Sequence, residues 1–296
     1  MSGALKDDDS SPAMRIGNLL GRAVVLDGDF AIDIAEASGG EFPSDPSALF
    51  EAWTEFWDWA RSTPPSLPRR RYRFEELGPP IPRPRQVFAV ALNYLDHAEE
   101  VGVTRPEVPL IFTKFPSCIT GPSGVIELPG GSVDWEIELV VVIGRYAVFV
   151  EQELGWDHVA GLTVGQDLSE RQLQLRGPAP QYSLGKSYAG FGPIGPAVVT
   201  LDEIPDPSDV ELNCVINCED IQRDRSSSMI FKVPELIAHI SGVCAMYPGD
   251  LIFTGTPSGI GNRRVPQRFL QDGDELVSRI ERLGEMRHRF RKAERK

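Results

Sequence analysis

Residues 134–144, DWEIELVVVIG, set the architecture of the chain and hold its densest group of acidic residues. Alternate side chains of a β-strand point to opposite faces, so Asp134, Glu136 and Glu138 would share one face. The run 139–143 is apolar without alternation, which indicates a strand that is buried on both faces. We therefore expect a central strand whose acidic end lines a cavity.

The acidic end has a second interpretation, because an exposed edge strand shows the same polar alternation on one face. In a cavity, grouped carboxylates repel one another unless they are protonated or neutralised by a cation. Oxygen ligands without paired His or Cys favour Mg²⁺, Mn²⁺ or Ca²⁺ over Zn²⁺. A site for a divalent cation is the hypothesis that follows.

Two other segments carry candidate residues. Asp167 stands at the end of the apolar run LTVGQDL (162–168), where the alternative is a turn or helix-cap residue. In DHAEEV (96–101), His97 and Glu100 are three residues apart and share one face of a short helix. Such a carboxylate can orient an imidazole that acts as a general base. The alternative for this pair is a partly exposed histidine with acidic neighbours.

The rest of the chain consists of short β-rich runs that alternate with Gly and Pro turns, with few helix candidates. This pattern predicts an α+β, predominantly β protein, a mostly antiparallel sandwich or barrel-like roll rather than a parallel doubly wound sheet. We expect a disordered tail at 1–13, a small N-terminal α+β domain with a Pro-rich arm at 14–84, a metal-binding catalytic domain at 85–288, and a basic tail at 289–296.

The composition limits the partners. The chain has 30 basic and 43 acidic residues and a formal charge of -13, which argues against nucleic acid or an anionic membrane as a partner. No apolar stretch approaches the ~20 residues that cross a bilayer. The four cysteines stand in apolar or strand-like surroundings, and no signal-like segment is present, so we expect a cytoplasmic protein.

Seven motifs in series resemble the fumarylacetoacetate hydrolase family. The resemblance covers about Val87 to Gly284, with a weaker match from Met14 onward. The motifs are NYLDHAEE (93–100), FTKFPSCITGP (112–122), DWEIELVVVIG (134–144), QDLSERQLQ (166–174), GKSYAGFGPIGP (185–196), MIFKVPELIAHIS (229–241) and PGDLIFTGTPSGIG (248–261).

This resemblance implies a mixed β-sandwich roll of the fumarylacetoacetate hydrolase type with a small N-terminal domain, usually as a homodimer. It also implies Mg²⁺ or Mn²⁺ (with Ca²⁺ as a substitute in crystals), held by Glu136, Glu138 and Asp167. The catalytic residues implied are His97, Glu100 and Lys186. The substrate contacts implied are Tyr94, Lys114, Arg171, Gln174 and Thr256.

The function expected from the resemblance is metal-dependent hydrolysis of a carbon–carbon bond in a small 2,4-dioxo acid, an acylpyruvate or fumarylpyruvate. His97 would activate the water, the metal would stabilise the enolate, and Lys186 and Arg171 would offset negative charge. Relatives with the same chemistry isomerise or decarboxylate 2-hydroxy-diene-dioates or oxo acids in aromatic degradation. A catalytically silent ligand-binding member is the alternative of another class. The sequence departs from the residues that are common in the family at Gln172 and at positions 188–189, and these departures leave the choice of substrate open.

Overall fold

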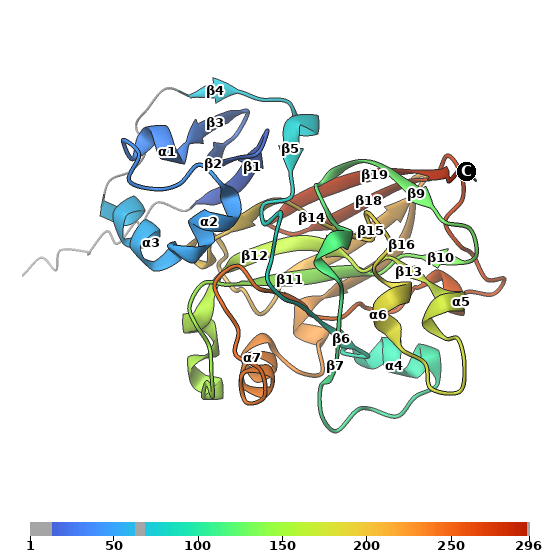
Figure 1. Cartoon of the computed structure of the whole chain (residues 1–296). Helices are drawn as coiled ribbons and strands as arrows, with labels where there is room; N and C mark the ends of the chain where they lie inside the picture. Colours follow the sequence, from blue (N-terminus) through green and yellow to red (C-terminus); the bar gives the residue numbers. More distant parts are fainter. Residues whose placement is uncertain (1–13, 63–68, 295–296) are drawn as a thin grey trace, which may run out of the picture.

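Two β-sheets make up most of the computed structural model, which describes residues 14–62 and 69–294 (Figure 1). The expected tail at 1–13 lies outside the described residues. The larger sheet runs β4 (Arg70–Arg71), β3 (Phe30–Asp33), β2 (Arg22–Asp27), β1 (Arg15–Leu19), β14 (Gly192–Val199), β12 (Val159–Gln166), β11 (Ile137–Ile143), β17 (Leu251–Phe253), β6 (Val87–Ala91) and β7 (Leu110–Thr113), with β5 (Leu77–Gly78) beside β1 and β8 (Ile119–Thr120) beside β14.

The smaller sheet packs against one face of the larger one. It runs β16 (Glu219–Arg225), β15 (Glu211–Ile216), β18 (Glu275–Ile280), β19 (Gly284–Lys292) and β9 (Ser123–Leu128), while β10 (Val133–Asp134) pairs separately with β13 (Ser169–Glu170). Most neighbouring strands are antiparallel, and only β17 with β6, β14 with β8, and β19 with β9 are parallel among the described pairs. The predicted fold class, mostly β and not doubly wound, is confirmed.

The helices are short. They are α1 (Ile34–Ala37), α2 (Pro46–Glu51), α3 (Trp53–Ser62), α4 (Leu95–Val101), α5 (Arg171–Gln174), α6 (Tyr182–Gly185) and α7 (Val233–Ser241). Helices α4, α5 and α6 lie together at one end of the sheets, where the candidate site is found (Figure 1). None of the helices that the structure describes has the length and apolar character to span a bilayer.

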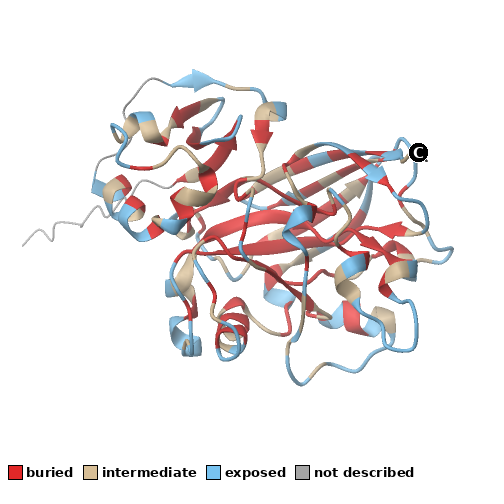
Figure 2. Ribbon diagram, in the orientation of Figure 1, coloured by how far each residue is buried: buried red, intermediate tan, exposed pale blue. Residues whose placement is uncertain are grey.

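Strand β11 supplies both hydrophobic cores, as its unbroken apolar run predicts. Leu139 and Val141 belong to the core between the two sheets, whereas Val140 and Val142 belong to a second core beneath the N-terminal unit. All four side chains are fully buried because the strand lies between β12 and β17 with one core on each face (Figure 2). The central position of this strand fixes where its acidic end must lie.

The N-terminal unit continues the larger sheet instead of forming one of its own. Strand β1 pairs with β14, in register from Arg15 with Val199 to Gly17 with Ala197. Trp53 and Phe56 of α3 pack into the second core, the one beneath the N-terminal unit. Residues 14–62 hold both strands and helices, but no break in the sheet separates them from the rest of the chain.

The expectation of a basic tail at 289–296 is wrong for residues 289–292, because these residues belong to strand β19. Met286, His288 and Phe290 are buried on one face of that strand, and the arginines between them are exposed. Alternation with a period of two is typical of a half-buried strand. The charges that indicate a tail therefore belong to the solvent face of a strand.

Candidate active site

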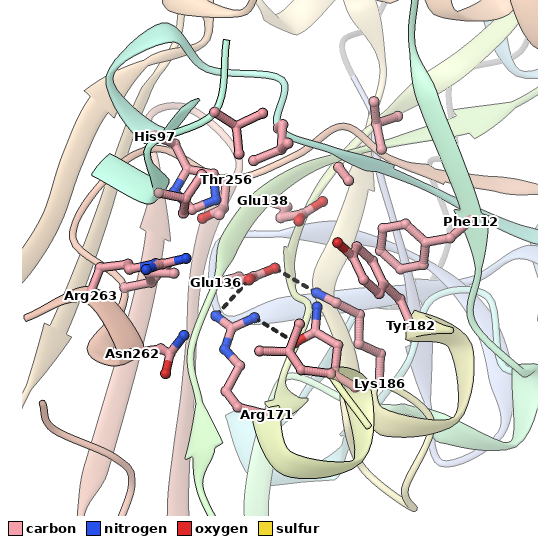
Figure 3. A pocket seen from close by; sticks show the side chains of 18 residues that line it. His97, Phe112, Glu136, Glu138, Arg171, Tyr182, Lys186, Thr256, Asn262 and Arg263 are labelled. Atoms are coloured by element: carbon pink, nitrogen blue, oxygen red, sulfur yellow. Dashed lines mark hydrogen bonds and ion pairs between the residues drawn. The ribbon is translucent and has the colours of Figure 1, made fainter. Parts of the chain in front are cut away.

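A pocket of about 150 Å³ lies where the acidic end of β11 meets α4, α5 and α6 (Figure 3). Pockets for drug-sized ligands have volumes of about 300–1,000 Å³, so this one suits a ligand of few atoms. Of the predicted site residues, those that line it are His97, Glu136, Glu138, Arg171, Gln174, Lys186 and Thr256.

The acidic segment 134–138 is not one continuous strand, because Trp135 and Glu136 lie between the end of β10 and the start of β11. The backbone N–H of Glu136 donates to the side-chain carbonyl of Gln166 (2.9 Å), and that of Ile137 donates to the side-chain carbonyl of Gln222 (3.1 Å). Both glutamines are buried, so water does not compete for these bonds. Two side-chain amides thus fix the backbone that carries the acids.

Three carboxylates converge on one point, one within β11, one directly before it and one directly after β12. Oxygens of Glu136, Glu138 and Asp167 lie within 4.8 Å of one another, and all three residues are buried. The backbone N–H of Asp167 donates to the carbonyl of Glu136 (2.9 Å), which ties the two segments together. The exposed edge strand considered for this segment is excluded, because β11 is an interior strand. We call these three residues the acid cluster.

Buried cations of the chain itself surround the acid cluster. The Lys186 ammonium lies 2.7 Å from the Glu136 carboxylate and also contacts that of Asp167, whose other oxygen lies 2.6 Å from Lys114. Arg171 lies 2.7 Å from the second oxygen of Glu136. The cation that the sequence predicts for these acids is therefore supplied in part by the chain itself, through lysine and arginine side chains from three other segments.

The acids differ in how well they are compensated. Burial raises the pKa of Glu136, but Lys186 and Arg171 outweigh it and lower that pKa to about 2. Glu138 makes no salt bridge within the described part of the chain, and its Oε2 accepts the N–H of Gly255 (2.8 Å). Burial, together with the neighbouring carboxylates, raises the pKa of Glu138 well above its usual range. Among the described residues, Glu138 is thus the acid of the cluster without a positively charged partner.

This donor set fits a divalent cation. The acid cluster and the buried Asp134 make four carboxylates and face three buried cations, so ionisation of all four leaves one uncompensated negative charge for a bound cation to neutralise. All the free ligand atoms are oxygens, which Mg²⁺, Mn²⁺ and Ca²⁺ prefer. Glu136, Glu138 and Asp167 are the residues that would hold such an ion.

The predicted pair on α4 is formed. His97 Nδ1 lies 3.0 Å from Glu100, and the other oxygen of Glu100 accepts the N–H of Gly259 (3.0 Å). A carboxylate only accepts, so Nδ1 carries a proton, and in the neutral imidazole Nε2 then keeps a lone pair. The His97 side chain is 8 % exposed and lines the pocket, so it has the surroundings of a positioned base rather than of a surface histidine.

The loop opposite the acid cluster is held by the same glutamine that supports the strand. Thr256 donates to the carbonyl of Ile137 (2.8 Å) and accepts from Gln222 (2.9 Å). The preceding Gly255 has φ +96°, and a Cβ there would lie 2.8 Å from the Cβ of Asn93. Only glycine suits that position, and its N–H is the donor to Glu138.

Two residues expected to contact substrate do not line the pocket. Tyr94 is fully buried in the core, and its hydroxyl has no hydrogen-bond partner among the described residues. The Lys114 ammonium donates to Asp167 and to the carbonyls of Lys186 and Phe191. Three bonds use all three of its N–H donors, so none is left for a ligand. Neither residue therefore lies where a substrate contact was expected, and Lys114 instead holds Asp167 and the backbone at Lys186 in place.

Asp134 also departs from the expectation that it shares a surface with the two glutamates. It accepts the backbone N–H groups of Gly261 (2.7 Å) and Asn262 (2.9 Å) and pairs with Arg171 (2.7 Å). The strand is interrupted directly after it, so the alternation does not continue. Asp134 thus fixes Arg171, which in turn donates to Gln174 (2.9 Å).

The sequence did not indicate several residues of the pocket wall. Asn262 and Arg263 lie on one side of the pocket, and Phe112 and Tyr182 lie on the other (Figure 3). The rings of Phe112 and Tyr182 pack edge to face with centroids 5.6 Å apart. Of these four residues only Phe112 falls within one of the motifs quoted above, and only the fold brings all four together around the pocket.

Comparison with known proteins matches residues 86–291 to the family model described as "Fumarylacetoacetate (FAA) hydrolase C-terminal". Oxaloacetate tautomerase FAHD2A, mitochondrial, from Homo sapiens is 44% identical over 222 residues, which are 74% of this chain and 70% of that protein. Its name places that relative in mitochondria, and this gives no support to the cytoplasmic location expected from the sequence.

Solved structures resemble the whole fold. An HpcE-type protein from Mycobacterium smegmatis is 54% identical with a TM-score of 0.91, covering 95% of this chain and 100% of that one. Maleylpyruvate hydrolase from Sphingobium sp. SYK-6, in complex with manganese(II) ion and pyruvate, is 27% identical with a TM-score of 0.78, covering 95% of this chain and 100% of that one.

Proposed function

Because the chain belongs to the fumarylacetoacetate hydrolase family, we propose that it is a metal-dependent enzyme that interconverts the keto and enol forms of a small 2-oxo acid such as oxaloacetate. The observation that carries the proposal is the juxtaposition, in one small pocket, of an undercompensated acid cluster and the His97–Glu100 pair. The activity named for the human relative supports the choice of reaction.

Proton transfer is the task of His97 in this mechanism. Its Nε2 takes a proton from C3 of the substrate, and the electron pair of that C–H bond becomes the C2–C3 double bond as the 2-oxo oxygen gains negative charge. Glu100 keeps the imidazole in the required tautomer and stabilises the imidazolium that results. Return of the proton to the 2-oxo oxygen gives the enol, so no other reactant is needed.

The remaining residues of the pocket manage charge. A divalent ion held by Glu136, Glu138 and Asp167 would supply Lewis-acid polarisation of the 2-oxo group. Lys186 and Arg171 are held at the pocket floor by the acids they pair with, and they offset negative charge that develops there. The apolar ring of Phe112 lines the same pocket, with the Lys186 ammonium 5.1 Å from its centroid.

The test follows the approach of freshly dissolved oxaloacetate to its keto–enol equilibrium by ultraviolet absorbance, with purified protein and Mg²⁺ or Mn²⁺. We expect catalysis that a chelator abolishes. His97→Asn should slow it by about 10²- to 10⁴-fold, the usual contribution of a general base, while metal affinity is unchanged. The proposal fails if His97→Asn keeps the full rate.

Hydrolysis of an acylpyruvate, the first expectation from the sequence, is the second candidate. The free Nε2 of His97 also suits activation of a water, and a maleylpyruvate hydrolase shares the fold. Release of pyruvate from an acylpyruvate distinguishes it from tautomerisation, which breaks no carbon–carbon bond. Binding of metal and 2-oxo acid without either reaction would instead support the catalytically silent alternative. The homodimer and the absence of a nucleic-acid or membrane partner stay predictions.

A further inference from the structure

One cation of the pocket wall, Arg263, has no partner among the residues that the structure describes. Lys186 and Arg171 are both paired with acids, but the guanidinium of Arg263 makes no salt bridge or hydrogen bond within residues 14–62 and 69–294. Figure 3 shows its guanidinium turned toward the pocket. A cation that the protein does not compensate is available to an anionic ligand.

The neighbouring amide is also free to donate. The side-chain carbonyl of Asn262 accepts from Gln267 (3.3 Å), which leaves the NH₂ group without an acceptor in the described structure. Asn262 lines the same pocket as Arg263, and the two residues are adjacent in the chain. Together they offer a planar guanidinium and an amide N–H, the donor types that recognise a carboxylate.

The short loop that carries these donors is held rigidly. The backbone N–H groups of Gly261 and Asn262 donate to the buried Asp134, and the N–H of Arg268 donates to the carbonyl of Gly261 (3.1 Å). A Cβ on Gly261 would lie 1.9 Å from the carbonyl oxygen of Arg268, so the loop closes on itself without spare room. A preorganised loop loses little conformational freedom when a ligand binds.

We propose that Arg263 and Asn262 bind a second carboxylate of the substrate, at the end remote from the acid cluster, and so select 2-oxo diacids over 2-oxo acids with a neutral end. This inference rests on the proposed function in placing the 2-oxo end at the acid cluster. The opposite wall, formed by Phe112 and Tyr182, offers no charge to that far carboxylate (Figure 3). The chain carries a formal charge of -13, so attraction for a dianion must come from a local cation.

The kinetic test compares oxaloacetate with its 4-methyl ester, which enolises in the same way but lacks the second charge. Arg263→Gln should raise KM for oxaloacetate by about 10- to 100-fold, the effect of losing a charge-assisted hydrogen bond, and leave the ester nearly unchanged. Asn262→Ala should act in the same direction with a smaller effect. Arg263→Lys should recover part of the loss, because lysine restores the positive charge but not the planar pair of donors that a guanidinium offers to a carboxylate.

The matched control is Arg264→Gln, the next residue along the chain. Arg264 pairs with the exposed Glu219 (2.9 Å) and does not line the pocket, so this variant should keep the wild-type preference for the diacid. The inference is overturned if Arg263→Gln changes the kinetics of acid and ester equally, or changes neither.

A binding measurement separates this inference from the proposed function. Calorimetric titration in Mg²⁺ uses pyruvate, which has only the 2-oxo end, and oxaloacetate already at its keto–enol equilibrium. Arg263→Gln should weaken oxaloacetate by about 10- to 100-fold and leave pyruvate unchanged. That pattern without turnover would refute the tautomerase and keep the diacid site. If the enzyme turns over oxaloacetate but Arg263→Gln weakens the binding of both ligands equally, the tautomerase proposal stands and the diacid site is refuted.

Discussion

The two halves of the segment 134–143 are equally buried but are stabilised in opposite ways. The half 139–143 is apolar, and each face of the strand packs into one of the two cores. The half 134–138 carries three carboxylates, and two of them, Asp134 and Glu136, depend on cations that come from α5 or from just beyond α6. Burial alone therefore does not distinguish a core from a site, whereas the source of the compensating charge does.

The strongest way to break this comparison is Lys186→Met, which removes the cation shared by Glu136 and Asp167. Two buried carboxylates then lose a partner, and we expect the free energy of unfolding at pH 7 to fall by about 3–5 kcal/mol. Urea denaturation measures the change, with the exposed Lys292→Met as a control for loss of a lysine. A loss below ~1 kcal/mol would mean that this charge does not stabilise the acidic half.

A buried histidine in the other sheet sharpens the comparison, because it stays neutral instead of being paired. The Nε2–H of His288 donates to the carbonyl of Gly121 (2.9 Å), and burial lowers the pKa of His288 to about 4. The unfolded chain takes up a proton below about pH 6.5, but the folded chain does not until about pH 4. Stability should therefore be full above pH 6.5 and fall by roughly 3 kcal/mol as the pH drops to 4.

His288→Gln should remove that part of the pH dependence, whatever its effect on stability at neutral pH. The measurement is the free energy of unfolding of each variant between pH 4 and 7. His239→Gln, which changes an exposed histidine, should keep the wild-type slope. Equal slopes for wild type and His288→Gln would show that His288 does not control stability in this range.

The smallest effect is expected in the apolar half. Ile143→Val removes one methylene from a fully buried side chain and should cost about 0.5–1.5 kcal/mol, with enzymatic activity unchanged. Thermal or urea unfolding measures it, with Val243→Ala at an 83 % exposed position as a control that changes stability little. A loss as large as that of Lys186→Met would show that the two halves do not differ as described.

The sequence predicts the fold where the pattern is local. The unbroken apolar run of β11 and the helical spacing of Trp53 and Phe56 both correspond to observed elements. Strand β19 was missed because its exposed arginines dominate the composition while Met286 and Phe290 are buried between them. The pairing of β1 with β14 joins residues far apart in the chain, and no local pattern specifies such a contact.

The same limit applies to the candidate site. The acid cluster and the His97–Glu100 pair stand in short motifs, and the structure brings each of them together. The expected substrate contact of Lys114 failed because its three acceptors come from segments more than fifty residues away. Arg263 was missed for the opposite reason, since a residue without a partner leaves no pattern in a sequence.

Because β1 pairs with β14, residues 14–84 and the rest of the chain are not two separable domains, although the sequence predicts a domain boundary between them. Excision of residues 14–84 would leave β14 with unsatisfied backbone groups along one edge and would strip Val140 and Val142 of their cover. Exposed edges of that kind recruit other chains. The region that matches the family model is thus unsuited to production as a separate fragment, and the N-terminal unit acts as the missing half of its core.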